Sequence, residues 1–262
     1  MSSGLTIGVG GALGRMGRAV SGLARARGDI ALAGRYDRPD AVDPGDDPLP
    51  LTTAAEVMKA ADVIIDFTTG PATAALATAA AKRGAPALVL GATGLTGEET
   101  AAISQAARHV AIVKSANFSV GVNVRAGLVE QAARRLGPDI WDIEILESHH
   151  RRKVDAPSGA AYLLGEAAAR GRGRPLTDLV LPPRHGITGE RPREGIGFSS
   201  LRGGGIVGEH SVVFAAEEET LTLTHIARDR ALFARGALEA AIWVARRPAG
   251  LYDMMDVLGF RD

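Results

Sequence analysis

From residue 4 to about residue 116 short apolar segments alternate with alanine-rich segments, and this alternation restricts the fold more than any other feature. Segments that are almost continuously apolar are typical of strands buried on both faces of a sheet. Such strands are parallel, and the helices that join them cover the two faces. We therefore predict an α/β fold with a doubly wound parallel sheet, whose strands are residues 5–10, 30–36, 62–67, 86–90 and 110–113.

Helices are predicted between these strands. One follows Gly14, and the others span residues 54–60, 72–82 and 97–108. Residues 38–50 are rich in Pro and Asp, which are poor helix and strand formers, so we predict an irregular surface loop there.

A glycine-rich segment, residues 8–17, lies between the first predicted strand and the first predicted helix. Gly11, Gly14 and Gly17 permit a tight turn and bring backbone N–H groups to a helix N-terminus, where a pyrophosphate can bind. A glycine-rich turn without a ligand is the alternative, because the spacing alone is a weak signal. The context favours a dinucleotide, since Asp37 follows the glycines by about 20 residues, where an acidic side chain binds ribose hydroxyls.

The residues around Asp37 bear on the choice between two dinucleotides. Arg38, with Arg35 as a second candidate, offers positive charge to a 2′-phosphate. We therefore predict a Rossmann-type domain that uses NADPH or NADH. Residues 91–93 and 115–118 follow the fourth and fifth strands, at the sheet edge where such folds bind ligands. Each segment alone could be an ordinary turn, but together they are candidate walls for the nicotinamide half.

Beyond residue 117 the pattern changes to a second, α+β domain. A helix is predicted over residues 120–136, a half-exposed strand over 141–146 and a second helix after Ser158. Gly, Pro and Arg dominate residues 171–207, and an antiparallel hairpin follows at 209–216 and 220–226. A helix at 230–246 returns to the first domain. The predicted domains are residues 1–119 with 230–262, for the dinucleotide, and residues 120–229, for the substrate.

Composition excludes several classes of protein. Thirty basic and thirty acidic residues give a net charge of zero, so we do not expect nucleic acid as a partner. No apolar run reaches the roughly 18 residues that a membrane span needs. The N-terminus lacks the features of a secretory signal, and there is no cysteine, so we expect a cytoplasmic protein without thiol chemistry.

Residues 147–159, ESHHRRKVDAPSG, form a strongly basic segment between a predicted strand and a predicted helix. A solvated basic loop is the simplest interpretation. Against it, the segment holds two of the six histidines, and histidine exchanges a proton near neutral pH. We do not expect a metal ion, because neighbouring cations would oppose its charge. A site for an anionic small molecule fits the residues better.

At this point the sequence closely resembles the bacterial 4-hydroxy-tetrahydrodipicolinate reductases, also called dihydrodipicolinate reductases, along almost its whole length. The basic segment is the most specific motif. The other matching motifs are GALGRMG from residue 11, DFT at 66, GATG at 91, SANFSVGVNV from 115, GITGERPREGIGF from 186, GGIVGEHSV from 204 and LYDMMDVLGF from 251.

The resemblance implies a homotetramer that associates through a mixed or antiparallel sheet of the second domain. It also implies reduction of a small cyclic dicarboxylate by NADPH or NADH with loss of water, in lysine (diaminopimelate) biosynthesis, without a metal. A dehydrogenase acting on another amino-acid intermediate and a non-catalytic dinucleotide sensor remain alternatives. Neither of them explains the basic segment.

The resemblance also assigns roles to residues. His149 would donate or accept the proton, Lys153 would donate a proton beside it, and His150 would bind substrate. Gly159 and Ala160 would bind a substrate carboxylate, although the family pattern has Thr where this chain has Ala160. The positions assigned to the dinucleotide are Gly11, Ala12, Leu13, Gly14, Arg15, Met16, Asp37, Arg38, Gly91, Ala92, Thr93, Ser115, Ala116, Asn117 and Phe118.

Overall fold

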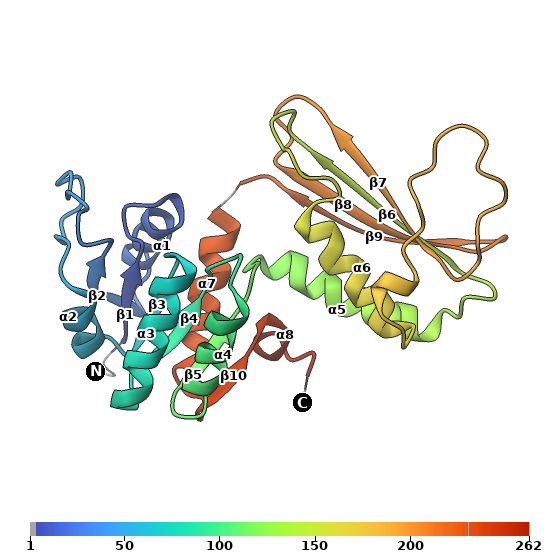
Figure 1. Cartoon of the computed structure of the whole chain (residues 1–262). Coiled ribbons are helices and arrows are strands. Elements are labelled where there is room, and N and C mark those ends of the chain that lie inside the picture. The colour runs from blue at the N-terminus through green and yellow to red at the C-terminus, as the bar shows by residue number, and fades with distance from the viewer. Residues whose placement is uncertain (1–3, 230, 262) are drawn as a thin grey trace. The chain divides into compact units, whose positions relative to one another are not determined.

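The computed structural model describes residues 4–229 and 231–261. The chain divides into two compact units, residues 4–120 with 231–261 and residues 121–229, and each contains one sheet (Figure 1). The structure thus combines a parallel sheet with a second, mixed sheet, as the sequence predicts. The use of each unit for cofactor or substrate stays a prediction.

The first unit contains a six-stranded parallel sheet with the strand order β10-β5-β4-β3-β1-β2. All five predicted strands are confirmed within one or two residues at each end. The sixth, β10, was not predicted, because three residues carry too little pattern. The strands are β1 (Leu5–Gly10), β2 (Ile30–Tyr36), β3 (Val63–Asp66), β4 (Ala87–Leu90), β5 (Ala111–Lys114) and β10 (Gly250–Tyr252).

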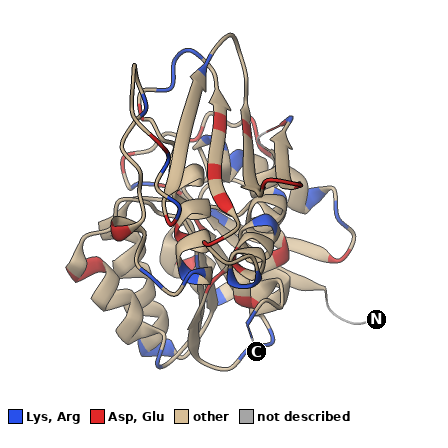
Figure 2. Cartoon of the chain, turned by 90° about the vertical axis from the view of Figure 1, so that its right-hand side faces the viewer, with Lys and Arg blue, Asp and Glu red and all other residues tan. Residues whose placement is uncertain are grey.

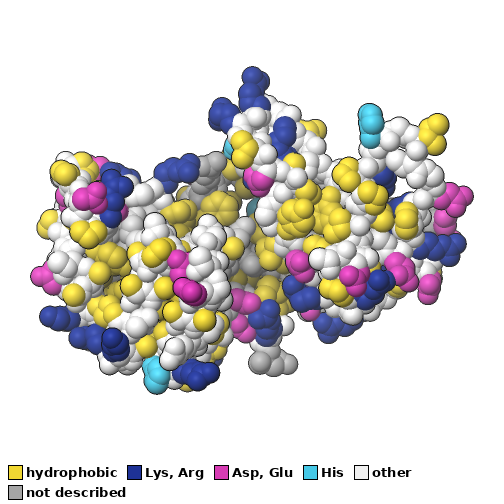
Figure 3. Space-filling view, viewed as in Figure 1, with side chains coloured by type: hydrophobic (Ala, Val, Ile, Leu, Met, Phe, Trp, Pro, Cys, Tyr) yellow, Lys and Arg dark blue, Asp and Glu magenta, His cyan; other side chains and the backbone are white. Residues whose placement is uncertain are grey.

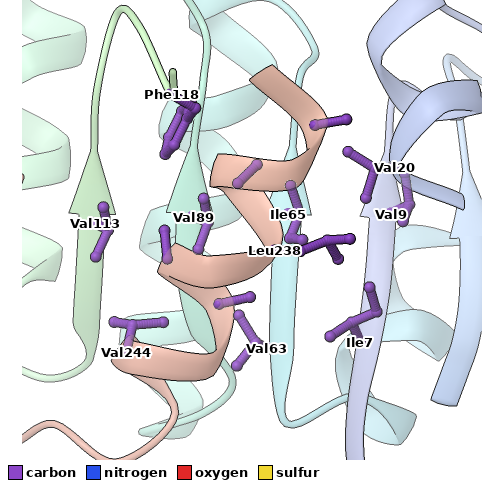
Figure 4. Packing of buried hydrophobic residues seen from close by; sticks show 14 of the residues in the cluster. Ile7, Val9, Val20, Val63, Ile65, Val89, Val113, Phe118, Leu238 and Val244 are labelled. Carbon is purple, nitrogen blue, oxygen red and sulfur yellow. The ribbon is translucent and has the colours of Figure 1, made fainter. Parts of the chain in front are cut away.

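Helices cover both faces of this sheet, because successive residues of a buried strand point to opposite sides. Val63 and Ile65 face the cluster that includes α1 and α7, shown in Figure 4, whereas Ile64 faces the cluster that includes α2, α3 and α4. The helix predicted at 230–246 therefore does pack on the first unit, although Arg230 lies outside the described residues. The helices are α1 (Arg15–Arg25), α2 (Ala54–Ala60), α3 (Gly70–Arg83), α4 (Gly97–Ala106), α7 (Ala231–Val244) and α8 (Met254–Val257).

The second unit is a four-stranded sheet with the order β7-β6-β8-β9. Strand β7 is parallel to β6, and the other neighbouring pairs are antiparallel, so the sheet is mixed. Helices α5 and α6 supply Val129, Ala133, Leu164 and other apolar residues to the core on one face of it. The elements are α5 (Val120–Arg135), β6 (Asp142–His149), α6 (Gly159–Gly171), the 3-10 helix Leu176–Asp178, β7 (Ile196–Arg202), β8 (Gly208–Ala215) and β9 (Thr220–Ala227).

In this unit one predicted boundary was wrong and one strand was missed. Strand β6 continues to His149 instead of ending at 146, so the first residues of the basic segment lie in the sheet. Strand β7 lies within residues 171–207, where no strand was predicted. It is an edge strand whose sequence, IGFSSLR, has only a short apolar start, and a strand of that kind shows little periodicity.

The described helices include none with the length and apolar character needed to cross a membrane. Basic and acidic residues both occur across the view in Figure 2, and the face in Figure 3 shows charged side chains of both signs among hydrophobic ones. This distribution agrees with the net charge of zero.

Two glycines of helix α1 give a matched test of this packing. A Cβ at Gly17 would lie 2.2 Å from the carbonyl oxygen of Gly11, whereas a Cβ at Gly22 would meet nothing within 4 Å. We expect Gly17→Ala to lower the free energy of unfolding by about 1–3 kcal/mol, because backbone atoms must move. Gly22→Ala should raise it by about 0.5–1 kcal/mol, since alanine restricts the unfolded chain. Urea unfolding of both variants checks this, and equal effects would contradict the packing described.

Candidate active site

The glycine loop connects β1 to α1 at the carboxyl edge of the parallel sheet. Gly11 has φ +70°, a conformation that favours glycine, and its carbonyl accepts a hydrogen bond of 3.0 Å from the Gly14 N–H. Gly14 is the N-cap of α1 and has no side chain to satisfy the N–H groups of the first turn. The loop therefore presents free donors and the positive end of a helix to a ligand.

The acidic partner of the loop is held beside it. The Leu13 N–H donates to Asp37 Oδ2 over 2.8 Å, and the Ala12 N–H donates to the Tyr36 carbonyl over 3.1 Å. Arg38, the next residue, is exposed and forms an ion pair of 3.2 Å with the exposed Asp40. An exposed pair of this kind is weak, so Arg38 can turn to a ligand.

Arg35 does not serve as a second phosphate ligand, and that sequence-based suggestion was wrong. It is 1% exposed and donates to the Leu49 carbonyl over 2.7 Å. Its guanidinium also pairs with Asp47 at 3.2 Å and with Asp43 at 3.4 Å. These contacts fix the irregular loop 38–50 against β2, which leaves the Arg35 guanidinium no free edge for a 2′-phosphate.

The loops after β4 and β5 lie at the same sheet edge as the glycine loop. The Gly91 N–H donates to the Asp66 carbonyl over 2.8 Å, and the Ser115 N–H donates to the Leu90 carbonyl over 3.1 Å. Phe118 is 2% exposed and meets Phe67 edge to face, with ring centroids 5.8 Å apart. The ring of Phe118 therefore belongs to the core, so only its backbone is available to a cofactor.

A buried polar cluster supports this edge. Asp66 ends β3 with no exposed surface, and it accepts hydrogen bonds from the hydroxyls of Tyr36, Thr68 and Thr73. A Cβ at Gly10 would collide with Asp66 and Tyr36. The DFT motif therefore packs beneath the glycine loop and supports it.

In the second unit His149 ends strand β6 and is 9% exposed. Its Nδ1 is hydrogen-bonded to the carboxylate of Glu147, two residues earlier on the same face of the strand. Arg202 of β7 holds Glu147 with two hydrogen bonds, of 2.6 Å and 3.0 Å. The His210 ring lies edge to face with His149, at a centroid distance of 5.0 Å.

This environment changes the pKa values of its ionisable groups. Burial alone would raise the pKa of Glu147, but hydrogen bonds from Arg202, Ser200 and His149 outweigh burial and bring it to about 2. Burial lowers the pKa of His149; Glu147 opposes that shift, and Lys153 and Arg202 add to it. Burial, with help from Arg125, lowers the pKa of His210 to about 3. Glu147 is thus ionised and both histidines are neutral at pH 7.

Lys153 lies in the turn that follows His149. Its Nζ donates to both oxygens of Asp155, over 2.8 Å and 2.9 Å, and the Lys153 side chain is 20% exposed. Arg202 also donates to the Asp155 carbonyl over 2.7 Å, so one guanidinium holds both Glu147 and this turn. His150 is half-buried, and its carbonyl accepts from the Lys153 N–H over 3.1 Å.

Helix α6 begins directly after the basic segment. Ser158 is its N-cap, and its hydroxyl accepts from the Ala161 N–H over 3.2 Å and is 3.1 Å from His210 Nε2. The cap leaves the N–H groups of Gly159 and Ala160 as first-turn donors. A Cβ at Gly159 would meet nothing within 4 Å, so the space beside these donors is open.

Glu147, His149 and His210 also place possible metal-ligand atoms within 4.8 Å of one another. Both carboxylate oxygens of Glu147, however, already accept hydrogen bonds from Arg202. The charges of Arg202 and Lys153 would also oppose a bound cation. These contacts fit an ion-paired carboxylate better than a metal ligand, and the absence of a metal stays a prediction.

Sequence reasoning gave no role to Glu147, Arg202 or His210, although two of them lie in the motifs that carried the resemblance. One signal was available in the sequence, because side chains along a strand such as β6 alternate between the two faces of the sheet. Ile143 and Ile145 face the core, so Glu147 and His149 must face it too. A carboxylate on a buried face requires a partner, but the sequence could not identify Arg202 because β7 was not predicted.

Comparison with known proteins assigns the chain to a family. The family model for the N-terminus of dihydrodipicolinate reductase matches residues 5–118, and that for its C-terminus matches residues 121–258. The chain belongs to the dihydrodipicolinate reductase family.

Individual relatives agree with the assignment. The 4-hydroxy-tetrahydrodipicolinate reductase of Caulobacter vibrioides is 52% identical over 261 residues, covering 100% of both chains. That of Rhizobium rhizogenes is 48% identical over 260 residues, covering 95% of this chain and 94% of the relative. A dipicolinate-bound dihydrodipicolinate reductase from Paenisporosarcina sp. TG-14 has a TM-score of 0.80 at 22% identity, covering 97% of this chain and 99% of that one. This last likeness shows the shared fold.

The family assignment confirms what the sequence predicted of fold and enzyme class. The chain is an oxidoreductase, and the family's reduction belongs to lysine biosynthesis. Neither alternative function, a dehydrogenase of another intermediate or a non-catalytic sensor, is that of this reductase family.

Proposed function

We propose that this reductase converts 4-hydroxy-tetrahydrodipicolinate to tetrahydrodipicolinate, with loss of water, and that His149 exchanges the proton of that reaction. The observation that carries the assignment is His149 itself, a neutral histidine whose Nδ1 is fixed by Glu147 while Lys153 lies in the adjoining turn. A positioned acid or base stabilises the charge that develops on the substrate during reduction. Lys153 is the proton donor beside His149.

The substrate carboxylates bind at the start of α6. The free N–H groups of Gly159 and Ala160 and the positive end of the helix attract an anion there. His150 and Lys153 supply further polar contacts. The Thr hydroxyl of the family pattern is missing at Ala160, but the backbone donors that remain are sufficient for a carboxylate.

The first unit binds NADPH or NADH at the glycine loop. The residues fit this cofactor for two reasons. Side chains at positions 10 and 11 would collide with the residues beneath the glycine loop, so glycine is needed at both. Gly14 also has no side chain to cap the N–H groups at the start of α1, which stay available to a ligand. The reduced nicotinamide supplies a hydride when bound. Asp37 binds ribose hydroxyls, Arg38 meets a 2′-phosphate, and residues 91–93 and 115–118 border the nicotinamide half. The cytoplasm, which holds the reduced dinucleotide pool, is the proposed location.

Two variants separate the roles of His149 and the α6 start. His149→Ala should lower kcat by about 10²–10⁴, the usual cost of losing an acid or base, with little change in the KM for NADPH. Gly159→Val should instead raise the KM for the substrate at least tenfold, because a branched side chain would occupy the open space beside the donors. Steady-state kinetics at 340 nm measures both. A kcat of His149→Ala within threefold of the wild type would exclude the proposed role.

Arg38 is the residue that contacts the 2′-phosphate of NADPH, so its loss should affect NADPH and not NADH. Removing a charge-assisted hydrogen bond costs about 1.5–3 kcal/mol, so Arg38→Ala should raise the KM for NADPH at least tenfold and leave that for NADH nearly unchanged. Arg83→Ala, which removes another exposed arginine of the same unit, is the control and should change neither. Equal losses with both cofactors would show that Arg38 does not contact the phosphate.

The enzyme is proposed to be a homotetramer that associates through the outward face of the four-stranded sheet. That face carries Leu146, Leu201 and Ile226, which are 45%, 54% and 52% exposed, opposite the side covered by α5 and α6. These exposed apolar side chains on an uncovered sheet face support the proposal that this face is the interface.

An arginine on this face should dissociate the assembly. Leu146→Arg should reduce the mass measured by light scattering from four chains to two or one, because like charges would meet across the interface. Val42→Arg places the same side chain at an exposed apolar position of the first unit and should leave the mass unchanged. A wild-type mass of one chain would exclude the tetramer.

A further inference from the structure

A row of polar side chains crosses the whole four-stranded sheet on the face that packs against the helices. Glu147 of β6 pairs in register with Ser200 of β7 on one side and His210 of β8 on the other, and His210 pairs with His225 of β9. The residues before them in β6 on that face are apolar, namely Ile143 and Ile145. A buried, ionised carboxylate is stable only when cations or hydrogen-bond donors contact it. The contacts of Glu147 therefore indicate its role.

Glu147 is an acceptor only. Its side chain is 1% exposed, and Arg202 donates to both carboxylate oxygens. An ionised carboxylate has no proton to donate, so the ring nitrogen that faces it must carry the hydrogen. That nitrogen is Nδ1 of His149. Neutral His149 therefore has its proton on Nδ1 and a lone pair on Nε2.

The opposite side of the ring is free to exchange a proton. No other described residue forms a hydrogen bond to His149 Nε2, and strand β8 contributes a glycine next to it. A Cβ at Gly208 would lie 3.2 Å from Nε2, so the glycine leaves this nitrogen unobstructed.

Charged and titratable groups reach this ring from each surrounding element. Glu147 contacts it from β6 and raises its proton affinity, whereas Arg202 of β7 and Lys153 of the turn lower it. His210 of β8 is neutral and lies edge to face with it. Arg125 of α5 and His225 of β9 surround His210 in turn, so Glu147 is the one anion among the described groups facing His149.

We propose that Glu147, held by Arg202, is the positioning residue that keeps the proton of neutral His149 on Nδ1, so that His149 exchanges its reaction proton through Nε2. The inference rests on the proposed role of His149. It makes Glu147 and Arg202 necessary for turnover although neither has to touch the substrate.

The wild-type tautomer gives the first test. Nitrogen-15 NMR of histidine-labelled enzyme, with the His149 signals assigned from a His149→Asn variant, distinguishes a protonated from an unprotonated ring nitrogen. We expect Nδ1 protonated and Nε2 unprotonated at pH 8. A proton on Nε2 in the wild type would overturn the proposal, whatever the variants do.

Glu147→Gln is the second test. Arg202 will retain the amide oxygen, so the Gln NH₂ will face Nδ1 and move the His149 proton to Nε2. We expect kcat to fall at least tenfold with less than a threefold change in KM. The acid limb of the kcat profile should also move to lower pH, because the anion that raises the pKa of His149 is gone. Glu147→Asp keeps the charge and should recover part of kcat.

Glu144→Gln is the matched control. Glu144 lies on the same strand and is also bonded to two arginines, Arg184 and Arg191, but it faces away from His149. It should change neither the tautomer nor the pH profile. An equal kcat loss in both variants, or an unchanged tautomer in Glu147→Gln, would refute the role of Glu147. Wild-type turnover in His149→Asn would instead refute the proposed function of His149, and the tautomer measurement would still decide the inference about Glu147.

Discussion

The ion pair between partly exposed Arg202 and buried Glu147 is the contact on which the geometry of the second unit's site depends. Arg202 donates to both oxygens of Glu147 and to the carbonyl of Asp155, so a single side chain connects β7, β6 and the turn that carries Lys153. Removing Arg202 would leave the buried charge of Glu147 uncompensated, and loss of one partner from a fully buried pair costs about 3–5 kcal/mol. His149, through Nδ1, and Lys153, through Asp155, are thus positioned by the same guanidinium.

The candidate dinucleotide site of the first unit depends on segments that pack closely against the glycine loop, and not on paired charges. Gly11 adopts a positive φ, Gly17 brings α1 against the Gly11 carbonyl, and a Cβ at Gly10 would collide with Tyr36 and Asp66. Substitution at any of these positions would push the loop away from the sheet edge. The two units therefore place different demands on the sequence: small residues in one, and paired charges in the other.

The need for small residues in the first unit and for paired charges in the second explains which parts of the two sites could be predicted from the sequence. Gly11, Gly14, Gly17 and Asp37 are local in sequence, and their geometry follows from a strand, a turn and a helix. The strands of the first unit were predictable for the same reason, since burial on both faces makes them continuously apolar. Arg35 misled the interpretation because its partners, Asp43, Asp47 and the Leu49 carbonyl, belong to a loop without regular structure.

The second unit resisted prediction because its contacts join distant residues. Arg202 is 55 positions from Glu147 in sequence, on an edge strand with little periodicity. His210 reaches Ser158 across 52 positions. The motifs around these residues were visible, but only the sheet register shows that Glu147 lies opposite Ser200 and His210.

His149 has to satisfy two electrostatic requirements at once. A group that accepts a proton must be neutral before the reaction, and burial, Lys153 and Arg202 all lower its pKa to that end. It must also bear positive charge after it accepts the proton, and Glu147, one hydrogen bond away, stabilises that charge. An isolated buried histidine would meet the first requirement and fail the second. With the ionised carboxylate at Nδ1 and the cations nearby, the same ring can meet both.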